Sequence, residues 1–285
     1  MRAADKVTVF YQVLVMVLIL FNLSKINAPF LWLTFHVVLI AVLCLIAIQS
    51  PRGWLKHLAF WSPIFIILLN FSELHYLIHN IRPNDLDPLL IQLDYQMFGV
   101  HPTLWLEQFT HPFLTEVLQI VYTSFYFLPI ILIILLQIDK QDDKADFFIF
   151  TVMFGFYLSY IGYFCVPAIG PRFTLNHLQT FQLQGLFLTQ PIRLLLDTIE
   201  NIQRDAFPSG HTAITLITMF YAFKYQRNYF YILLVIGTSL IVSTVYLRYH
   251  YVADVIGGLI LTIVVIWSAG FVYKFLNNRK FEQSS

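Results

Sequence analysis

The chain has 285 residues, of which 58% are hydrophobic and 12% are charged. Soluble globular domains carry about 25% charged residues, so this composition excludes an ordinary soluble enzyme. The 17 Lys and Arg nearly balance the 16 Asp and Glu. The resulting formal charge of +1 gives no electrostatic basis for a nucleic-acid partner. The composition indicates a membrane protein.

Long apolar runs follow one another along most of the chain. A helix needs about 20 mostly apolar residues to cross the hydrocarbon core of a bilayer. Eight runs approach this length without strand-like alternation, although the sixth is short and the first is marginal. They predict an all-α polytopic membrane bundle of about eight transmembrane helices. The predicted spans are 7–23, 30–48, 58–80, 114–138, 147–166, 211–225, 229–247 and 251–276.

Eight spans place both termini on the same side of the membrane. That side carries eleven of the Lys and Arg residues and the opposite side six, so the positive-inside rule predicts cytoplasmic termini. The long connections 81–113 and 167–210 then face the periplasm, the exterior or a lumen. Their mixed apolar and acidic residues predict short interfacial helices. Asp85, Asp87 and Asp94 are expected to cap these helices, and contact of one of them with the lipid head group is the alternative.

Other polar residues within or near the apolar runs have simple interpretations. Cys44 and Cys165 lie inside such runs and are interpreted as buried packing residues. Glu73, His75 and His79 lie near the outer end of the third run. For these three residues, interfacial hydrogen bonding, or lining the path by which a lipid enters, is favoured over metal binding.

Three segments on the predicted outer side concentrate polar residues that are costly beside lipid: 168–172 (AIGPR), 207–211 (FPSGH) and 244–254 (TVYLRYHYVAD). In the second segment, Pro and Gly favour a sharp turn before His211 opens the sixth span. A helix N-terminus presents unpaired N–H groups, so the Ser209 hydroxyl and the Gly210 N–H are expected to hold phosphate oxygens beside His211 as proton donor. The alternative is a plain helix cap whose histidine faces interfacial water.

The third segment carries His250 and Asp254, four residues apart on one helix face. A carboxylate there can bind one imidazole nitrogen and leave the other free to attack an electrophile. A packed structural pair and a pair of metal ligands are the alternatives, and metal is the weaker one because further ligands lack recognisable spacing. Arg172 and Arg248 supply guanidinium groups suited to phosphate oxygens.

With these residues the sequence resembles the type 2 phosphatidic acid phosphatase (PAP2) superfamily. That superfamily has three ordered motifs, Lys-x6-Arg-Pro, Pro-Ser-Gly-His and Ser-Arg-x5-His-x3-Asp. The second motif is complete at 208–211, and the third is present as Ser243, His250 and Asp254. The resemblance covers roughly residues 58–276 and implies three regions: two additional transmembrane helices in 1–57, a six-helix PAP2-like catalytic core in 58–276, and a cytoplasmic tail in 277–285.

The sequence departs from these motifs at cationic positions. Cys165 stands where the first motif has Lys, and Phe173 where it has Pro. In the third motif Thr244 replaces Arg, while Arg248 lies one helical turn later. Arg248 is a possible replacement for the missing guanidinium group, and Arg204 is a second.

The resemblance implies a two-step phosphoryl transfer without metal or cofactor. His250 would be the nucleophile that becomes phosphohistidine, Asp254 its orienting partner and His211 the general acid. The groups implied to bind the phosphoryl oxygens are those of Arg172, Arg248, Ser209 and Gly210.

The predicted function is an integral membrane lipid phosphate phosphatase. With these departures from the motifs, the sequence looks more like the branch that includes fungal inositol phosphorylceramide synthases. A head-group phosphotransferase with a lipid alcohol as acceptor is therefore an alternative. A proton-coupled transporter or flippase, with the histidines and Asp254 relaying protons, is an alternative of another class. The sequence leaves the lipid, the acceptor and the oligomeric state open.

Overall fold

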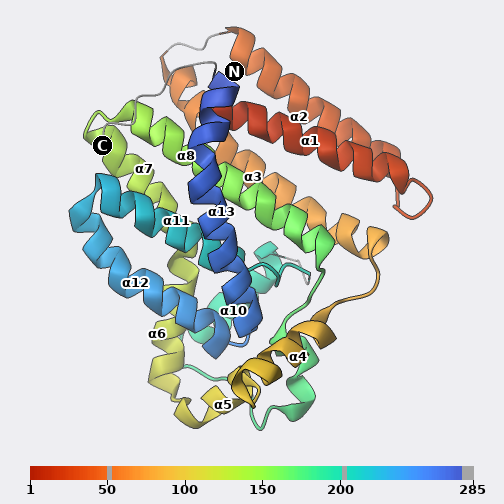
Figure 1. The fold of residues 1–285 in the computed structure, drawn as a ribbon, viewed down its shortest axis with the longest axis vertical. Coiled ribbons are helices and arrows are strands. Elements are labelled where there is room, and N and C mark those ends of the chain that lie inside the picture. The colour runs from red at the N-terminus through yellow and green to blue at the C-terminus, as the bar shows by residue number, and fades with distance from the viewer. Residues whose placement is uncertain (50–52, 201–203, 278–285) are drawn as a thin grey trace.

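The computed structural model describes residues 1–49, 53–200 and 204–277, and all regular structure in these ranges is helical (Figure 1). The main helices are α1 (Ala3–Phe21), α2 (Pro29–Gln49), α3 (Trp54–Ile81), α6 (Pro112–Thr123), α7 (Leu128–Ile138), α8 (Asp142–Cys165), α11 (Gly210–Tyr225), α12 (Arg227–Tyr246) and α13 (Val252–Asn277). The long connections contain α4 (Asp87–Phe98), α5 (Pro102–Trp105), η1 (Leu106–Phe109), α9 (Pro171–Thr174), η3 (Asn176–Leu178) and α10 (Thr189–Glu200), and η2 (Ser124–Tyr126) separates α6 from α7.

The described residues contain six helices long and apolar enough to cross a membrane, or seven if a bent pair counts as one span. That pair is α6 with η2 and α7, which meet at an angle of 51°. Pro129 lies in the first turn of α7 and has no N–H to continue the preceding helix. Helix α11 has 16 residues and is about 24 Å long. The all-α multi-pass membrane fold is therefore confirmed, whereas the count of eight spans is not.

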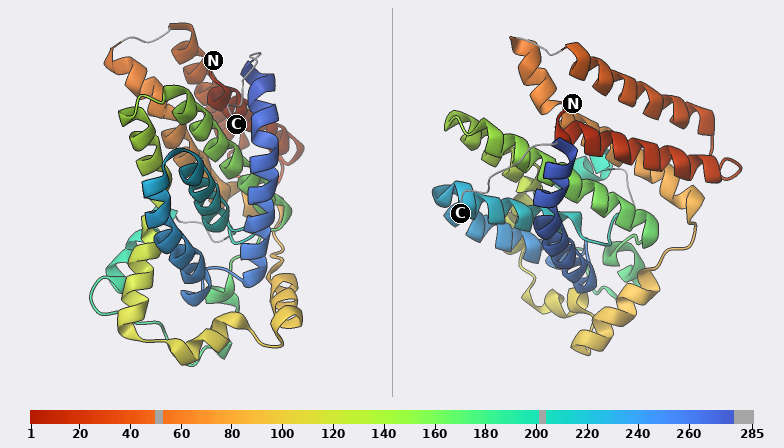
Figure 2. Two further views of the ribbon diagram at one scale, coloured as in Figure 1. Left: turned by 60° about the vertical axis from the view of Figure 1, so that its left-hand side comes forward. Right: turned by 45° about the horizontal axis from the view of Figure 1, so that its top comes forward.

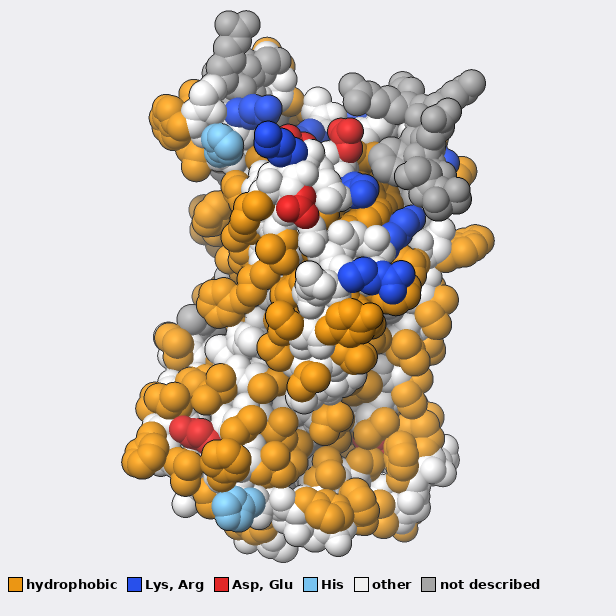
Figure 3. Space-filling model, turned by 90° about the vertical axis from the view of Figure 1, so that its left-hand side faces the viewer, with side chains coloured by type: hydrophobic (Ala, Val, Ile, Leu, Met, Phe, Trp, Pro, Cys, Tyr) orange, Lys and Arg blue, Asp and Glu red, His pale blue; other side chains and the backbone are white. Residues whose placement is uncertain are grey.

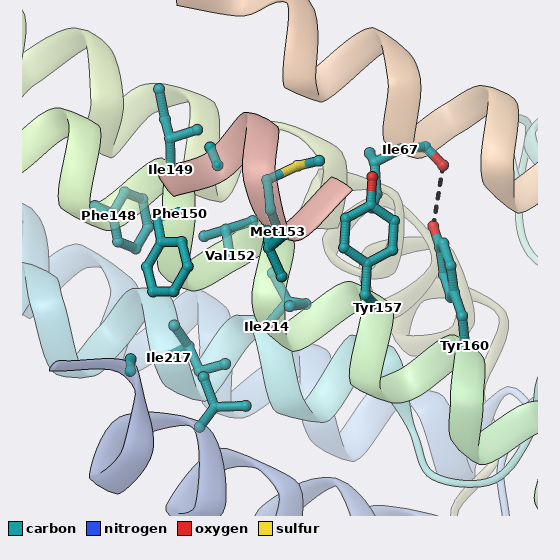
Figure 4. Packing of buried hydrophobic residues seen from close by; sticks show 14 of the residues in the cluster. Ile67, Phe148, Ile149, Phe150, Val152, Met153, Tyr157, Tyr160, Ile214 and Ile217 are labelled. Carbon is teal, nitrogen blue, oxygen red and sulfur yellow. Dashed lines mark hydrogen bonds between the residues drawn. The ribbon is translucent and has the colours of Figure 1, made fainter. Parts of the chain in front are cut away.

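Helix α8 forms the centre of the bundle and packs against α1, α3, α7, α11 and α13. Half of its buried residues are Phe or Tyr, and the buried side chains point in several directions, as expected for a helix surrounded by other helices. Figure 4 shows Tyr157 and Tyr160 on α8 near α3, where the Tyr160 hydroxyl donates to the Ile67 carbonyl over 3.2 Å. Ile214 and Ile217 of α11 pack on another side of the same helix.

Helices α1 and α2 lie against one side of this bundle (Figure 2). Between them and α3, the buried Glu73 carboxylate lies 3.5 Å from the ring of His36. Interfacial hydrogen bonding was the wrong prediction for Glu73, because the turn of α3 that carries it faces inward.

The prediction that both cysteines are buried was also wrong: Cys165 is exposed and Cys44 is partly exposed. Both lie on helix faces that the bundle leaves uncovered.

The two long connections form one end of the molecule, where α4 and α5 lie together in Figure 1. Half of the Trp105 surface is exposed there (51%), as suits an interfacial anchor. The predicted short helices are thus present in both connections. Figure 3 shows Lys and Arg side chains gathered toward the opposite end of one face, above a mostly apolar middle. The N-terminus lies at that basic end (Figure 2).

Candidate active site

The Pro-Ser-Gly-His turn begins α11 and is fixed from two sides. Ser209 is the N-cap of α11, and its hydroxyl oxygen accepts from the Thr212 N–H over 3.2 Å and from the Thr212 hydroxyl over 3.1 Å. This leaves its hydroxyl hydrogen for another acceptor. The Ser209 N–H donates to the Asp254 carbonyl over 3.0 Å. A Cβ on Gly210 would approach the Tyr163 hydroxyl to 2.6 Å, so a larger residue here would displace the Tyr163 side chain.

His250 precedes α13, and its Nδ1 has two oxygen neighbours. The Ala206 carbonyl lies 2.9 Å from Nδ1, and Oδ2 of the buried Asp254 carboxylate lies 3.3 Å from it. Asp254 is itself oriented by the Tyr251 N–H, which donates to Oδ2 over 2.8 Å. Because both neighbours of Nδ1 are acceptors, this nitrogen carries the hydrogen and Nε2 has a free lone pair.

The second histidine meets that free nitrogen. His211 Nδ1 lies 3.3 Å from His250 Nε2, and the ring centroids are 5.5 Å apart. With an acceptor at His250 Nε2, Nδ1 of His211 is the donor of this contact. The His211 ring is held between the rings of Tyr122, at 4.6 Å, and Phe125, at 4.4 Å. The structure thus brings together His211, His250, Asp254 and the Ser209–Gly210 turn.

The two arginines that are predicted to bind phosphate each contact a carboxylate in this structure. Arg172 makes a bidentate contact with Asp197 of α10, over 2.8 and 2.7 Å. Its guanidinium lies 5.7 Å from the Tyr249 ring centroid. Tyr249 stacks on Tyr122, which stacks on His211. Arg172 is therefore separated from the histidine pair by two stacked rings.

Arg248 is buried and more completely bound. It donates to the Glu107 carboxylate over 2.8 Å, to the Gln179 side-chain oxygen over 2.7 Å and to the Phe181 carbonyl over 2.9 Å. These contacts join η1 to the segment before α10. Arg204, the other possible replacement, forms an ion pair with Asp85 at 2.6 Å.

Two acids predicted as caps of interfacial helices join the motif segments instead. Asp87 accepts from the N–H groups of Ile169 and Gly170 over 2.9 Å each and from the Tyr251 hydroxyl over 2.8 Å. Asp94 caps α13 through the N–H groups of Val252 and Ala253. The cap prediction was wrong for both, because each carboxylate faces a segment distant in sequence. No short-range pattern marks such contacts.

A guanidinium lies near residue 165, where the first PAP2 motif has its lysine. The sequence did not indicate this contact. Arg82, directly after α3, donates to the backbone carbonyl of Cys165 over 2.8 Å. The side chain of Arg82 thus lies at the end of α8, although Cys165 itself carries no charge.

An apolar cavity of about 140 Å³ leads from this site into the bundle between α3, α7 and α8. Its polar end is lined by Asp205, Gly210, His211 and Tyr163. One side of α8 lines it from Tyr163 to Ile149, a rise of about 21 Å. That length exceeds half the thickness of a hydrocarbon core of about 30 Å. Asp205 and the cavity were missed by sequence reasoning, since neither belongs to a motif.

Comparison with known proteins agrees with this arrangement. The sequence profile of the PAP2 superfamily matches residues 89–268, which include both histidines and Asp254. A PA-phosphatase related-family protein from Dictyostelium discoideum is 27% identical over 178 residues, 55% of this chain and 32% of that protein. The chain thus matches about a third of the length of this curated relative. No solved structure matches significantly. Because the profile covers more than half of the chain, the protein belongs to the PAP2 superfamily.

Proposed function

We propose that this protein is an integral membrane lipid phosphate phosphatase that acts through a phosphohistidine. One observation carries the proposal: two imidazole nitrogens lie 3.3 Å apart, with the tautomer of one determined by its acceptors, where an apolar cavity ends. A water-soluble phosphate ester would have no use for such a cavity. A lipid phosphate would place its head at the histidines and an acyl chain among the apolar residues.

In the proposed first half-reaction, His250 Nε2 attacks phosphorus and the bond to the leaving alcohol oxygen breaks. Asp254 and the Ala206 carbonyl stabilise the positive charge that His250 gains. His211 protonates the leaving oxygen, which requires protons on both of its nitrogens. The negative charge of the bound phosphate favours that form. In the second half, a hydroxyl oxygen attacks phosphorus and releases His250. No metal is required by these steps.

The phosphoryl oxygens would be held by the Ser209 hydroxyl, the N–H groups that begin α11, and the arginines. Arg172 has the bidentate geometry that carboxylate and phosphate share, but its guanidinium would have to move past the stacked rings of Tyr249 and Tyr122 to reach a phosphate at the histidines. Its pair with Asp197 is partly exposed, so exchange of one anion for another costs little free energy. To bind phosphate, Arg248 would have to break its hydrogen bonds to three acceptors. We therefore propose that in the free enzyme it holds those neighbours in place, and that it contacts phosphate only after these bonds break.

A head-group phosphotransferase is the second candidate, and one observation favours it. A separate apolar groove of about 460 Å³ lies between α4, α5, α12 and α13. Val252 and Val255 of the first turns of α13 line it, next to Asp254. A transferase needs places for two lipids, and this groove would supply the second. The transporter or flippase hypothesis stays untested.

Purified protein in a chelator, offered a panel of lipid phosphates with and without lipid alcohols, tests the proposal by mass spectrometry. Free phosphate identifies a phosphatase, and a new phosphodiester or phosphate ester of the added alcohol identifies a transferase. We expect His250→Ala to lose all turnover. His211→Ala should lose most activity on lipid phosphates but retain more on esters of acidic alcohols, which leave without a proton. Full activity of His250→Ala would refute the mechanism.

A further inference from the structure

The apolar cavity has one continuous face of α8 as its back wall. The residues of α8 that line it are Ile149, Val152, Met153, Phe156, Tyr160 and Tyr163. Residues three or four positions apart lie on the same side of a helix, so this wall follows the helix axis. Its upper end, at Tyr163, lines the cavity together with Gly210 and His211. The cavity therefore runs from the histidine pair along α8.

One long side of the cavity is accessible from outside the bundle. Helices α3 and α7 each pack against α8, and their residues form the two side walls. Leu68 of α3 lines the cavity, yet 47% of its surface is exposed, and Ile130 of α7 is partly exposed. We call this opening between α3 and α7 the lateral slot. Through it a lipid chain can pass from the bilayer into the cavity without meeting water.

The far end of the cavity is closed by isoleucine side chains. Ile133 of α7 and Ile149 of α8 are its deepest lining residues on those helices, and each has only 1% of its surface exposed. About one helical turn beyond them, Leu136 and Ala145 are fully buried in the core of the bundle. Ile149 and Met153 lie on the same side of α8 in Figure 4. A chain that enters along this side meets Ile149 and cannot continue in line.

The length and the volume of the cavity both fit one chain of limited length. An extended chain advances about 1.2 Å per bond, so a rise of about 21 Å along α8 corresponds to about 17 bonds. About four of these bonds join the phosphate oxygen to an acyl carbonyl through glycerol, which leaves an acyl chain of about 14 carbons. A cavity needs about 10–15 Å³ to hold one water molecule, so about 140 Å³ accommodates on the order of ten water-sized groups. A methylene group is about that size, so there is room for most of one chain and not for two.

We propose that Ile133 and Ile149 are specificity-determining residues, which limit the acyl chain of a lipid phosphate bound at the histidines to about 14 carbons. The inference rests on the function proposed above and identifies its preferred substrates as lipid phosphates with a chain of medium length. The second chain of a diacyl lipid stays in the bilayer, outside the lateral slot. Lipid tails are as apolar as the cavity wall, so a longer chain gains no free energy from burial and has to bend out of the slot at the closed end.

A series of phosphatidic acids that differ only in chain length tests the inference. The full-length purified protein hydrolyses each of them in mixed micelles at a fixed surface concentration. We expect kcat/KM to be highest near chains of about 14 carbons and to fall about tenfold or more for chains of about 18, because a few misplaced methylene groups in an apolar pocket change kcat/KM by that much. Equal kcat/KM values for all chain lengths would overturn the inference.

Variants at the closed end should move the preferred length in opposite directions. Ile149→Phe fills the end of the cavity and should shorten the preferred chain by about two carbons, with the shortest substrates hydrolysed as by the wild type. Ile149→Ala enlarges the end and should shift the preference to longer chains. Ile134→Phe is the matched control, since Ile134 adjoins Ile133 on α7 but is 42% exposed on the outside of the bundle, and its profile should not change. An equal loss for all chain lengths in Ile149→Phe, together with an unshifted profile in Ile149→Ala, would refute the assigned role.

Photocrosslinking locates the end of the chain without relying on turnover. The probe is a phosphatidic acid with one acyl chain of about 14 carbons that ends in a diazirine, bound to the His250→Ala protein. Peptides that contain Ile133 or Ile149 should be labelled, and an excess of phosphatidic acid without diazirine should suppress this labelling. Labelling confined to residues on the outside of the bundle, such as Ile134, would mean that no chain occupies the cavity.

Failure of the inference is distinguishable from failure of the function. If hydrolysis depends on His250 but not on chain length, the role of Ile133 and Ile149 is wrong and the phosphatase proposal stands. If the wild type releases no phosphate from any phosphatidic acid, the proposed function fails for these lipids. The crosslinking result at Ile149 then still decides whether the cavity holds a lipid chain.

Discussion

His250 has two acceptors for its Nδ1 hydrogen, and they differ in chemistry. The Ala206 carbonyl is neutral, and the Asp254 carboxylate is buried and aligned by the Tyr251 N–H. Either acceptor suffices to keep the hydrogen on Nδ1. Only a negative carboxylate also stabilises the positive charge that develops on the ring during attack.

Because Ala206 and Asp254 both hold the tautomer of His250 but only Asp254 stabilises its positive charge, the effect of Asp254→Asn can be predicted. Loss of a triad aspartate costs about 10⁴-fold when the histidine tautomer is lost as well. The Ala206 carbonyl keeps the tautomer here, so we expect kcat to fall by roughly 10²- to 10³-fold. Steady-state hydrolysis of a lipid phosphate, with His250→Ala as the inactive reference, measures the loss. Activity equal to that of His250→Ala would mean that Ala206 contributes nothing to orientation.

Among the helices, α13 packs unusually close to the catalytic turn. A Cβ on Gly258 would lie 2.6 Å from the Ser209 carbonyl oxygen, which belongs to the backbone and cannot rotate away. The glycine thus allows the helix that carries Asp254 to approach the turn that carries His211. The distance between the two histidines depends on this helix contact.

Gly258→Ala should therefore separate the two histidines without removing any reactive group. A displacement of about 1 Å at a reacting centre can cost about 10²-fold in rate, and we expect a loss of that order in kcat. Gly237→Ala is the matched control: its Cβ meets the flexible Met219 side chain between α11 and α12, away from the site. Equal activity losses in the two variants would contradict the explanation.

Helix α10 is held at its start by one carboxylate. Glu116 of α6 accepts from four consecutive backbone N–H groups, those of residues 186–189, and from the Thr189 hydroxyl. A Cβ on Gly185 would collide with the side chains of Thr189 and Glu116. The position of α10 matters because it carries Asp197, the partner of Arg172.

Glu116→Gln should loosen this attachment, because an amide has one acceptor oxygen where the carboxylate has two. We expect the amide hydrogens of residues 186–189 to exchange with solvent about tenfold faster or more, since hydrogen bonds to charged groups are the stronger ones. Hydrogen–deuterium exchange read by mass spectrometry measures this, and Gly185→Ala should have the same effect. Unchanged exchange at residues 186–189 in both variants would show that α10 is held by its apolar contacts alone.

At the scale of the whole molecule, the distribution of charge predicts orientation. Lys and Arg gather toward the end of the molecule that holds the N-terminus (Figures 2 and 3). Helix α13, which His250 directly precedes, begins near the long connections at the other end (Figure 1). The positive-inside rule then predicts cytoplasmic termini and a proposed active site on the opposite face.

Single cysteines in a Cys44→Ala, Cys165→Ala background test this topology in sealed, right-side-out vesicles. A membrane-impermeant maleimide should label Gln108→Cys at once, and Asp143→Cys only after the vesicles are opened. Both positions are exposed, so burial does not limit the reaction. The reverse pattern would place the proposed active site on the cytoplasmic side.

Apolar run lengths and local spacing were enough to predict the helical membrane fold, the short helices of the long connections, and the motif residues. These features depend on residues close together in the chain: about 20 apolar residues for a span, or four residues between His250 and Asp254. Proline at the start of α7 bent one expected span, which run length does not reveal. The division into 1–57, 58–276 and 277–285 stays a prediction.

Tertiary structure alone decided what surrounds the motif residues. It paired Arg172 with Asp197 and Arg248 with Glu107, it placed Asp205 beside His211, and it created the cavity along α8. An arginine or carboxylate can reach in several directions, so its partner depends on which helices meet and at what distance. Local sequence specifies the reactive groups of this protein, whereas the packing of distant helices decides which charges and which apolar surfaces face them.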